Sequence, residues 1–273
     1  MQSTWKNKNV MVCGASAGLG WQLVLSLAER HARVIMVARD PNRLNAAQAQ
    51  ILQRVPAAEL VSLSADLTDA ASAGNLAEEV RQRFGQLDLV INAVGESDRG
   101  SIEKLSVERV LELVRTNVGS GLNAIQQFAP LLKPTRGVLV LVGSLSSHFA
   151  PRFMGGYAIA KHGLAALAQQ ARLELAGDGV HVLLVSPGPI KRDDAGQRYS
   201  GSAQASDLPQ AALKSGGGAK IKGLDPLILA SEILDAAASR KKRLVRPRKA
   251  LLLLLANAVS SSLGDYLLRK FTT

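Results

Sequence analysis

Residues 9–39 read NVMVCGASAGLGWQLVLSLAERHARVIMVAR, and this stretch decides the fold. An apolar run (residues 9–13) ends at a glycine-rich turn (residues 14–20). The residues that follow have apolar side chains at helical spacing, and a second run rich in β-branched residues begins at Arg33. A strand, a glycine turn, a helix and a second strand in this order predict a βαβ unit, the building block of a parallel sheet.

The same alternation continues along the chain. Four further apolar runs predict strands, with helical patterns between them, at residues 59–68, 87–95, 137–144 and 179–188. Residues 107–132 are expected to form one long helix. Nearly continuous apolar strands are typical of a parallel sheet buried on both faces. We therefore predict a single α/β domain over residues 1–273, a Rossmann-like, doubly wound parallel sheet of about seven strands with helices on both faces.

Composition and charge restrict the class of protein. The chain has 273 residues, of which 47% are hydrophobic, so it can bury a large core. Seven positive charges of the net +11 lie in residues 240–249, which leaves only +4 for the rest of the chain. A basic surface for nucleic acid would extend further, so we predict no nucleic-acid partner.

Cysteine usage and hydropathy bear on the compartment. Cys13 is the single cysteine, which excludes an intramolecular disulfide and favours a reducing compartment. No apolar run has the length of a signal peptide or of a helix that spans a bilayer. We expect a cytoplasmic protein, and membrane association remains an alternative that depends on the C-terminal segment.

The glycine turn predicts nucleotide binding. Gly14, Gly18 and Gly20 let the backbone turn tightly and approach a pyrophosphate, and the N-terminus of the next helix supplies N–H donors. The spacing is G-x-x-x-G-x-G rather than G-x-G-x-x-G. A glycine-rich turn without a ligand is the alternative, but the position after the first strand of a βαβ unit favours a dinucleotide.

The end of the second strand indicates which dinucleotide binds. A carboxylate at this point accepts the ribose hydroxyls of NAD, whereas a cation pairs with the 2′-phosphate of NADP. Ala38 stands where a carboxylate would be expected, and Arg39 follows it. Asp40 is better explained as the cap of the helix that begins at Pro41. NADP(H) is therefore favoured, and NAD(H) remains the alternative if Arg39 is only a solvated charge.

A second group of polar residues predicts acid–base chemistry. Tyr157 and Lys161, in YAIAK, lie one helical turn apart, so the ammonium can lower the pKa of the phenol. Ser144 ends a predicted strand, at the edge where open α/β sheets bind ligands. Asn117 lies within a predicted helix, where an asparagine often has a side-chain or water partner. Tyr and Lys at this spacing also occur by chance on ordinary helices.

Together these motifs resemble the short-chain dehydrogenase/reductase family from about Lys8 to Pro189. The motifs that occur in the family's order and at its spacing are the glycine turn, ADL at 65–67, NAVG at 92–95, Asn117, Ser144, YAIAK and SPGPIK at 186–191. A looser pattern after residue 225 resembles members with a basic and apolar C-terminal extension. The resemblance implies an NADP(H)-dependent enzyme that transfers hydride between nicotinamide and a carbonyl or secondary alcohol, assembled as a homodimer or homotetramer.

The resemblance also implies roles for individual residues. Tyr157 would be the acid/base, Lys161 would bind the nicotinamide ribose and lower the Tyr157 pKa, and Ser144 would polarise the carbonyl. Asn117 would hold a water that relays protons to Lys161. The implied cofactor-binding residues are Gly14, Ser16, Gly18, Leu19, Gly20, Arg39, Asp66, Leu67, Asn92, Ala93, Gly95, Tyr157, Lys161, Pro187, Gly188 and Ile190. No metal site is implied.

The chain departs from the family pattern at three points. Cys13 stands where the family usually has threonine, Ala93 where it has a second asparagine, and Arg192 where threonine is common. The first two departures are expected to weaken the tethering of strands near the cofactor. Arg192 is expected to place a cation near the cofactor phosphates. None of the three removes a reacting group.

Residues 190–223 are rich in Gly, Ser and Ala and break the regular pattern, which predicts a substrate lid or a partly disordered loop. Phe149, Phe153 and Met154 add apolar surface that either lines the pocket or packs internally. The looser resemblance after residue 225 implies a lipid-like substrate, so we favour the reduction of an apolar ketone or a 3-oxo lipid-like substrate. The alternatives are an NAD-dependent alcohol or steroid dehydrogenase, a non-catalytic NADP-binding scaffold, and a membrane-surface binding module.

The C-terminus raises a question of its own. Residues 243–246 predict a seventh strand at the sheet edge, where basic side chains resist further pairing. A helical extension, residues 247–273, follows and carries an apolar stripe of Leu252, Leu255, Val259, Leu263 and Tyr266. The stripe predicts packing on the body or on a partner subunit. Residues 240–273 also fit an in-plane contact with a membrane.

Overall fold

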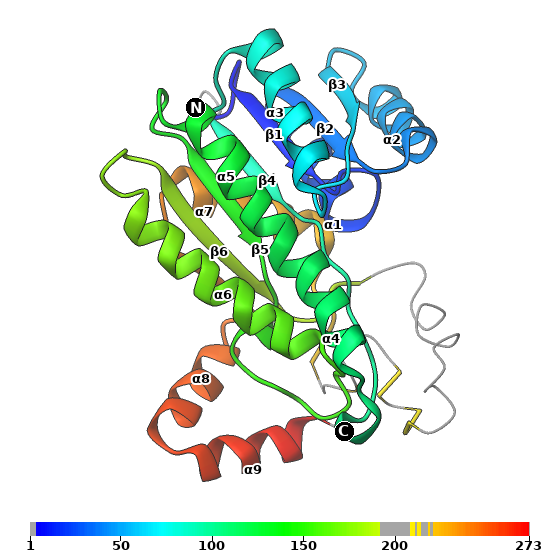
Figure 1. Ribbon diagram of the computed structural model, residues 1–273, viewed down its shortest axis with the longest axis vertical. Coiled ribbons are helices and arrows are strands. Elements are labelled where there is room, and N and C mark those ends of the chain that lie inside the picture. Colours follow the sequence, from blue (N-terminus) through cyan, green and yellow to red (C-terminus); the bar gives the residue numbers. More distant parts are fainter. Residues whose placement is uncertain (1–3, 192–207, 211, 214–217, 219–220, 273) are drawn as a thin grey trace.

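Seven parallel strands form one sheet in the computed structural model, which describes residues 4–191, 208–210, 212–213, 218 and 221–272 (Figure 1). The strands are β1 (Asn9–Cys13), β2 (Arg33–Ala38), β3 (Glu59–Ser64), β4 (Leu89–Asn92), β5 (Val138–Val142), β6 (His181–Pro187) and β7 (Arg243–Arg246). Their order is β3-β2-β1-β4-β5-β6-β7. The strand order reverses next to β1, as in a doubly wound sheet, so the predicted fold class is confirmed and β7 lies at the predicted edge.

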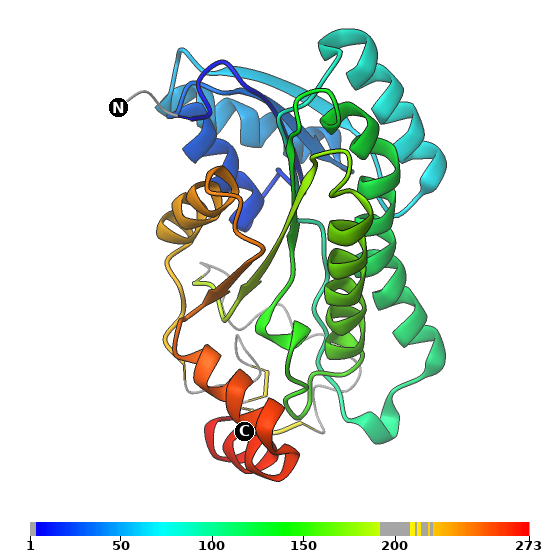
Figure 2. The same cartoon turned by 90° about the vertical axis from the view of Figure 1, so that its left-hand side faces the viewer.

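Helices cover both faces of the sheet. They are α1 (Gly18–Ala28), α2 (Pro41–Arg54), α3 (Ala70–Phe84), α4 (Val107–Val114), α5 (Ser120–Leu132), α6 (Tyr157–Glu174), α7 (Pro226–Ala238), α8 (Ala250–Val259) and α9 (Ser261–Phe271). The helices α1, α2 and α7 pack on one face, and α3, α5 and α6 pack on the other (Figure 2). The carboxyl ends of all seven strands therefore lie at one edge between two helical layers.

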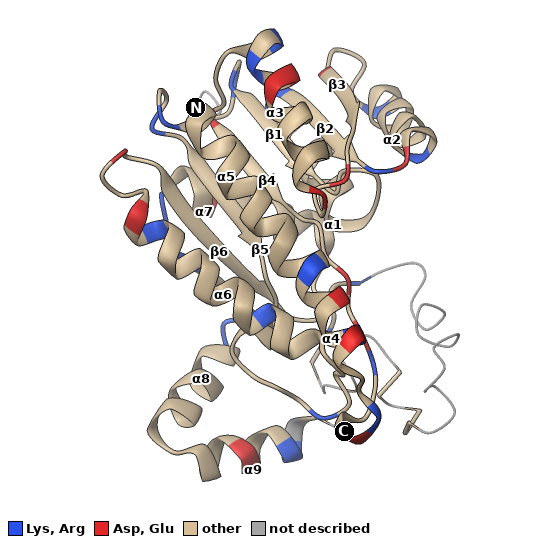
Figure 3. Ribbon diagram, in the orientation of Figure 1, with Lys and Arg blue, Asp and Glu red and all other residues tan. Residues whose placement is uncertain are grey.

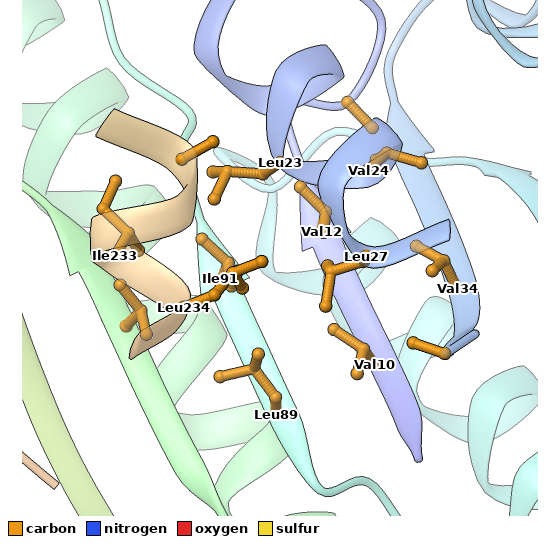
Figure 4. Close-up of a cluster of buried hydrophobic side chains, with 14 of the residues drawn as sticks. Val10, Val12, Leu23, Val24, Leu27, Val34, Leu89, Ile91, Ile233 and Leu234 are labelled. Atoms are coloured by element: carbon orange, nitrogen blue, oxygen red, sulfur yellow. The ribbon is translucent and has the colours of Figure 1, made fainter. Parts of the chain in front are cut away.

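The central strand β1 shows why the residues of the predicted strands are almost all apolar. Val10 and Val12 enter the core beneath α1 and α7, whereas Met11 and Cys13 enter the core on the opposite face. Figure 4 shows the first of these cores, with side chains from β1, β4, α1 and α7, among them Val10, Val12, Leu23, Leu27, Leu89, Ile91, Ile233 and Leu234. Successive strand residues point to opposite faces, so a strand buried on both faces needs apolar residues at every position.

The helix expected over residues 107–132 changes its type part-way. α4 passes into a π-helical segment, η2 (Arg115–Gly119), before α5 begins at Ser120. Asn117 lies in this segment, and its Nδ2 donates to the Leu113 carbonyl oxygen at 2.9 Å. This side-chain bond occupies a backbone acceptor of the preceding turn, which favours a wider turn at this point. The predicted long helix therefore forms, but it contains a π-helical turn that the sequence pattern does not indicate.

The C-terminal extension forms two helices, so the predicted apolar stripe does not lie on one continuous helix. α8 ends at Val259 and α9 begins at Ser261, with extended backbone at Ser260 between them. The Ser260 hydroxyl accepts a hydrogen bond from the Leu263 N–H at 3.3 Å, a serine cap that begins a new helix. The predicted stripe is divided between α8 and α9, and its residues are exposed rather than packed on the body. No helix in the described part of the chain is long and apolar enough to cross a membrane.

Candidate active site

A glycine turn joins β1 to α1, as the sequence predicts. Gly14 has φ +83°, and a Cβ there would stand 3.1 Å from the carbonyl carbon of Ala93 in the loop after β4. A Cβ on Gly20 would collide with the Gly14 carbonyl oxygen. Gly18 has φ +58°, and no described atom lies within 4 Å of its Cβ position. Two of the glycines close the turn, and the third faces open space in which a ligand can approach the backbone.

The N-terminus of α1 suits an anion. No side chain among the described residues caps α1, whereas α2, α3 and α7 each begin with an aspartate cap. The first-turn N–H groups of a helix carry a partial positive charge and need acceptors. The phosphate groups of a dinucleotide are such acceptors, so the glycine turn fits this part of a cofactor. Ser16 and Leu19, also predicted here, are half-buried.

Arg39 and Asp66 meet at the carboxyl ends of β2 and β3. Arg39 Nη1 lies 4.0 Å from Asp66 Oδ2, and the Arg39 side chain is 75% exposed. Partial burial by itself would raise the Asp66 pKa, but two hydrogen bonds from Thr68 and the charges of Arg39 and Arg115 outweigh it and lower the pKa. Asp40 caps α2, as predicted. Arg39 thus presents an accessible cation where the sequence analysis places a 2′-phosphate.

Three of the predicted residues converge at Gly95. A Cβ on Gly95 would lie 2.8 Å from Asn117 Oδ1 and 3.1 Å from Lys161 Nζ, so the space between them admits only glycine. Asn117 is fully buried, and its Nδ2 donates to the Glu96 carbonyl oxygen at 2.9 Å. Its Oδ1 accepts from the Glu96 N–H at 3.3 Å. The side chain of Asn117 therefore fixes the backbone that follows β4.

Lys161 is buried on α6, one turn after Tyr157. Its Nζ donates to the Val142 carbonyl oxygen at 3.1 Å and lies 5.7 Å from the centroid of the Tyr157 ring. The residue is 4% exposed, and this burial lowers the pKa of the Lys161 ammonium to about 8. Tyr157 is the first residue of α6, so the pair has the predicted spacing on one helical face.

Ser144 follows β5 and begins a short 3₁₀ helix, η3 (Leu145–Ser147). Its Oγ accepts from the Ser146 N–H at 3.1 Å, and its own N–H donates to Ser147 Oγ at 3.1 Å. These reciprocal bonds orient the Ser144 side chain while its hydroxyl hydrogen can still donate to another acceptor. η3 packs against α6, which places the Ser144 loop beside the helix that Tyr157 begins.

The two ends of the predicted lid are held together. The Leu224 N–H donates to the Pro189 carbonyl oxygen at 2.7 Å, and the Leu224 carbonyl accepts from the Lys191 N–H at 2.9 Å. Farther along the lid, the Ala212 carbonyl oxygen accepts from Nε of the buried Arg99 at 3.0 Å. The described parts of the lid thus connect the end of β6 with the loop after β4.

The end of β6 meets the beginning of the C-terminal extension. The Gly188 N–H donates to the Arg246 carbonyl oxygen at 2.7 Å. A Cβ on Gly188 would lie 3.2 Å from Pro247 and 3.3 Å from Leu145. Gly188 therefore stands between the C-terminal extension and η3, and any side chain here would push the two apart.

Other predicted cofactor residues are used by the fold itself. Leu67 is buried in the core, and the buried Asn92 donates from Nδ2 to a serine of α5 at 3.3 Å. A cofactor contact would have to come from the backbone atoms of these two residues. The remaining predicted positions are a buried Pro187 and the half-buried Ala93 and Ile190. Arg192, with its predicted cation, lies outside the described residues.

Two departures from the family pattern contact each other. The Ala93 N–H donates to the Cys13 carbonyl oxygen at 2.9 Å, which continues the β1–β4 ladder past the strand end. The Cys13 thiol is buried, and burial raises its pKa to about 12. The strands are thus joined at both positions by backbone atoms, so this bond does not depend on the side chain at either position.

Arg109 of α4 is a residue that the sequence analysis missed. Its guanidinium donates to Glu96 at 2.6 Å, to Asp98 at 3.4 Å and to Glu112 at 3.0 Å. Partial burial opposes its charge, but the three carboxylates outweigh burial and raise the Arg109 pKa. A Cβ on Gly155, just before α6, would lie 2.8 Å from Asp98. The cluster therefore links the loop after β4 to the turn before α6, and only the Arg109–Glu112 pair has a local sequence signal.

Residues 8–201 match the family model described as short chain dehydrogenase. The chain belongs to the short-chain dehydrogenase family. It is therefore an oxidoreductase that acts on CH–OH and C=O groups with NAD(P), and the enzyme class predicted from the motifs is confirmed.

Several known proteins are similar to this short-chain dehydrogenase. An uncharacterized oxidoreductase of Staphylococcus epidermidis is 30% identical over 205 residues, which cover 73% of this chain and 87% of that protein. The 3-oxoacyl-[acyl-carrier-protein] reductase of Escherichia coli (strain K12) is 28% identical over 190 residues, 69% of this chain and 76% of that protein. The structure of L-sorbose reductase from Gluconobacter frateurii with NADPH and L-sorbose has a TM-score of 0.77 at 19% identity and covers 90% of this chain and 97% of its own, which shows the shared fold.

The buried Lys161 predicts a pH-dependent stability. Its pKa is about 8 in the folded chain and near 10.5 in an unfolded one. Between these pH values the unfolded chain binds more protons, so the Lys161 contribution to stability rises with pH and its penalty is complete below pH 8. Lys161→Met removes this penalty, which amounts to about 3 kcal/mol.

The measurement is the free energy of unfolding in denaturant, without added nucleotide, for both proteins from pH 7 to pH 10. The variant should gain most relative to wild type at pH 7, and the difference should shrink as the pH rises. A difference that is constant over this range would show that Lys161 keeps its ordinary pKa.

Proposed function

We propose that this short-chain dehydrogenase is an NADP(H)-dependent reductase of an apolar ketone or a 3-oxo lipid-like substrate. The observation that carries the proposal is the convergence of Asn117 and Lys161 at Gly95, with Tyr157 one turn away on α6. This group lies at the carboxyl edge of the sheet, the edge that also holds the glycine turn. A cytoplasmic location belongs to the same proposal, and the single, buried cysteine is compatible with it.

The residues present fit a nicotinamide dinucleotide. Gly14, Gly18 and Gly20 with the uncapped end of α1 would hold the pyrophosphate, and Arg39 would hold the 2′-phosphate. When bound, the reduced cofactor supplies a hydride to the carbonyl carbon of the substrate. Gly188 would border the nicotinamide end, where a side chain would displace Pro247 or Leu145.

Side chains of the protein transfer the proton and stabilise the charge that develops on the substrate oxygen. Tyr157 gives its hydroxyl proton to the substrate oxygen as negative charge develops there. The Lys161 ammonium favours the phenolate form that remains, because a nearby positive charge lowers the phenol pKa. Ser144, held by its reciprocal bonds with η3, donates to the same oxygen.

Asn117 has a positioning role in this scheme. Its side chain is committed to the Glu96 backbone and to Leu113, and its Oδ1 faces the space beside Gly95 that Lys161 also borders. A water in that space would connect Lys161 to solvent through hydrogen bonds. The proton that Tyr157 gives up is replaced along this route.

The preference for NADP(H) over NAD(H) is supported by two observations. Arg39 is accessible, and its one ion pair among the described residues is the 4.0 Å contact with Asp66. A phosphate can therefore approach the guanidinium with little loss of existing bonds. Relatives of the same fold bind this cofactor, since the L-sorbose reductase structure contains NADPH and an alcohol dehydrogenase from Thermococcus sibiricus contains 5-hydroxy-NADP.

The substrate class is supported by the lid and by one relative. Leu208 and Ala212 of the lid are buried, and Ala212 contacts Arg99 beside the site. The lid therefore brings apolar side chains toward the carboxyl edge. The Escherichia coli relative is named for 3-oxoacyl substrates, whose 3-oxo group and acyl chain match the proposed class.

A homodimer or homotetramer is part of the same proposal. Large apolar side chains are exposed on the outer faces of α4, α5 and α6, namely Val107, Leu111, Leu122, Ile159 and Leu173. Exposed apolar patches of this kind mark interaction surfaces. These faces of α4, α5 and α6 therefore support an assembly in which copies of the chain pack through them.

Tyr157→Phe is the direct test of the proposed chemistry. The variant lacks the hydroxyl proton, so kcat should fall at least about a hundredfold, while the affinity for NADPH changes little. Turnover is followed by NADPH absorbance and binding by NADPH fluorescence. Tyr266→Phe, on the exposed face of α9, is the matched control and should keep full activity. Turnover that survives in Tyr157→Phe would exclude the proposed acid, and binding without turnover in the wild type with every ketone would favour the scaffold alternative.

Arg39→Ala tests the cofactor preference. Loss of a charge-assisted bond should raise KM for NADPH by about ten- to a hundredfold and leave KM for NADH nearly unchanged. Arg43→Ala, an exposed arginine on α2, serves as the control and should alter neither value. If Arg39→Ala changes KM for NADPH and KM for NADH equally, Arg39 does not bind the 2′-phosphate.

A chain-length series tests the substrate class. With NADPH, kcat/KM for 3-oxoacyl thioesters or 3-oxo esters should rise from four to ten carbons, by up to about fourfold for each CH₂ that becomes buried. Short polar ketones of equal concentration are the comparison. Faster turnover of the short polar ketones would exclude an apolar substrate and leave the hydride-transfer assignment intact.

A further inference from the structure

The helices α8 and α9 form a C-terminal hairpin, residues 250–271, that stands outside the two helical layers. Figures 1 and 2 both show it at one end of the molecule, beyond the carboxyl edge of the sheet. The helices pack on each other, and α8 also contacts the end of β7. Gly264 is buried against Asn257, since a Cβ on Gly264 would collide with the Asn257 amide oxygen. The hairpin is thus a defined unit with most of its surface facing away from the body.

The surface of the C-terminal hairpin is unusually apolar. Large hydrophobic side chains are exposed along both helices, at Leu251, Leu252, Leu255, Val259, Leu263 and Tyr266. Leu252 is 70% exposed and Val259 is 84% exposed. Ala250 is the one residue of α8 that is buried. Scattered surface leucines need no explanation, but Leu252, Leu255 and Val259 recur at helical spacing and so share one exposed face of α8, which indicates an interaction surface.

The charges around the hairpin are mostly positive. α8 has no charged residue, as Figure 3 shows, and exposed basic residues stand before α8 and at the end of α9. They are Arg248 and Lys249 before α8 and Arg269 and Lys270 at the end of α9. Asp265 is the single acidic residue from 240 to 273. An apolar face bordered by cations is complementary to acyl chains beneath anionic headgroups.

A second copy of the chain is a poorer occupant for the same face. A two-fold interface would place the hairpin against its own equivalent, and the flanking cations of both copies would then meet. With one acidic residue per hairpin, most of those like charges would have no partner. We propose that the C-terminal hairpin binds, in the plane of the interface, to a membrane surface that contains anionic lipids.

The position of the hairpin relates this surface to the site. Pro247, which precedes α8, would contact a Cβ on Gly188 at 3.2 Å, and Leu145 borders the same glycine at 3.3 Å. The hairpin therefore begins at the carboxyl edge of the sheet, beside the loop that Ser144 opens. A membrane bound there would bring apolar substrates to this edge. This consequence rests on the proposed function, whereas membrane binding itself does not.

Vesicle sedimentation tests the proposal with the full chain. Wild type should sediment with phosphatidylcholine vesicles that contain phosphatidylglycerol, less with phosphatidylcholine alone, and less as salt is added. The double variant Leu252→Ser with Leu255→Ser removes the apolar contact, and Arg248→Glu with Lys249→Glu removes the cations. Each double variant should lower the vesicle partition coefficient at least about tenfold. For the charge variant, the reason is that each basic residue near an anionic surface strengthens binding roughly fivefold.

Matched controls change the same residue types elsewhere. Leu227→Ser with Ile228→Ser alters exposed apolar residues of α7, and Lys6→Glu with Arg43→Glu alters exposed cations distant from the hairpin. Both should bind vesicles like wild type, and all variants should keep NADPH turnover in detergent-free solution. Wild type that stays in solution with anionic vesicles would overturn the proposal. So would hairpin variants that bind vesicles normally but lower the mass seen by light scattering, because the face would then meet a second copy.

Discussion

The candidate site depends on the buried ammonium of Lys161, which lies beside Gly95, a residue that has no side chain. Lys161 Nζ and Asn117 Oδ1 approach Gly95 so closely that no Cβ fits between them. Burial destabilises the Lys161 ammonium and brings its pKa to about 8. The ammonium is stabilised by a backbone carbonyl of β5 rather than by a carboxylate. A carboxylate would raise the lysine pKa and cancel much of its field at Tyr157.

The surrounding architecture serves to keep these groups in place. Asn117 can reach the loop after β4 because the chain widens into a π-helical turn at Arg115–Gly119. That loop is held from its other side by Arg109, whose three carboxylate partners come from two segments. Loss of either support would release Gly95 from its position. Such π-helical turns are common at functional sites, since they aim a side chain that a regular helix would turn away.

The features that the sequence predicts are those that depend on residues close together along the chain. The βαβ unit, the Asp40 cap and the edge strand β7 follow from hydrophobic period, cap residues and glycine spacing, all of which act within a few positions. The π-helical turn depends on Asn117 finding Glu96, twenty-one residues away, and the Arg109 cluster depends on the same loop. Neither contact has a local signal. The helix break at Ser260 does have a local signal, because a serine of Ser260–Ser262 can cap a new helix. The apolar stripe that continues on both sides of the break obscures that signal.

The basic run of residues 240–249 illustrates how the fold divides a sequence feature. Arg240 donates to the carbonyl oxygens of Arg136 and Gly179, and Arg246 Nε donates to both carboxylate oxygens of Glu232 of α7, at 2.9 and 2.8 Å. These arginines hold the edge strand against the body. Arg248 and Lys249 follow Pro247 and so stand outside the sheet, at the start of the hairpin. A charge run that reads as one patch in the sequence is therefore divided by the fold: Arg240 and Arg246 bond to the body, whereas Arg248 and Lys249 are exposed beside the hairpin, where a lipid headgroup could meet them.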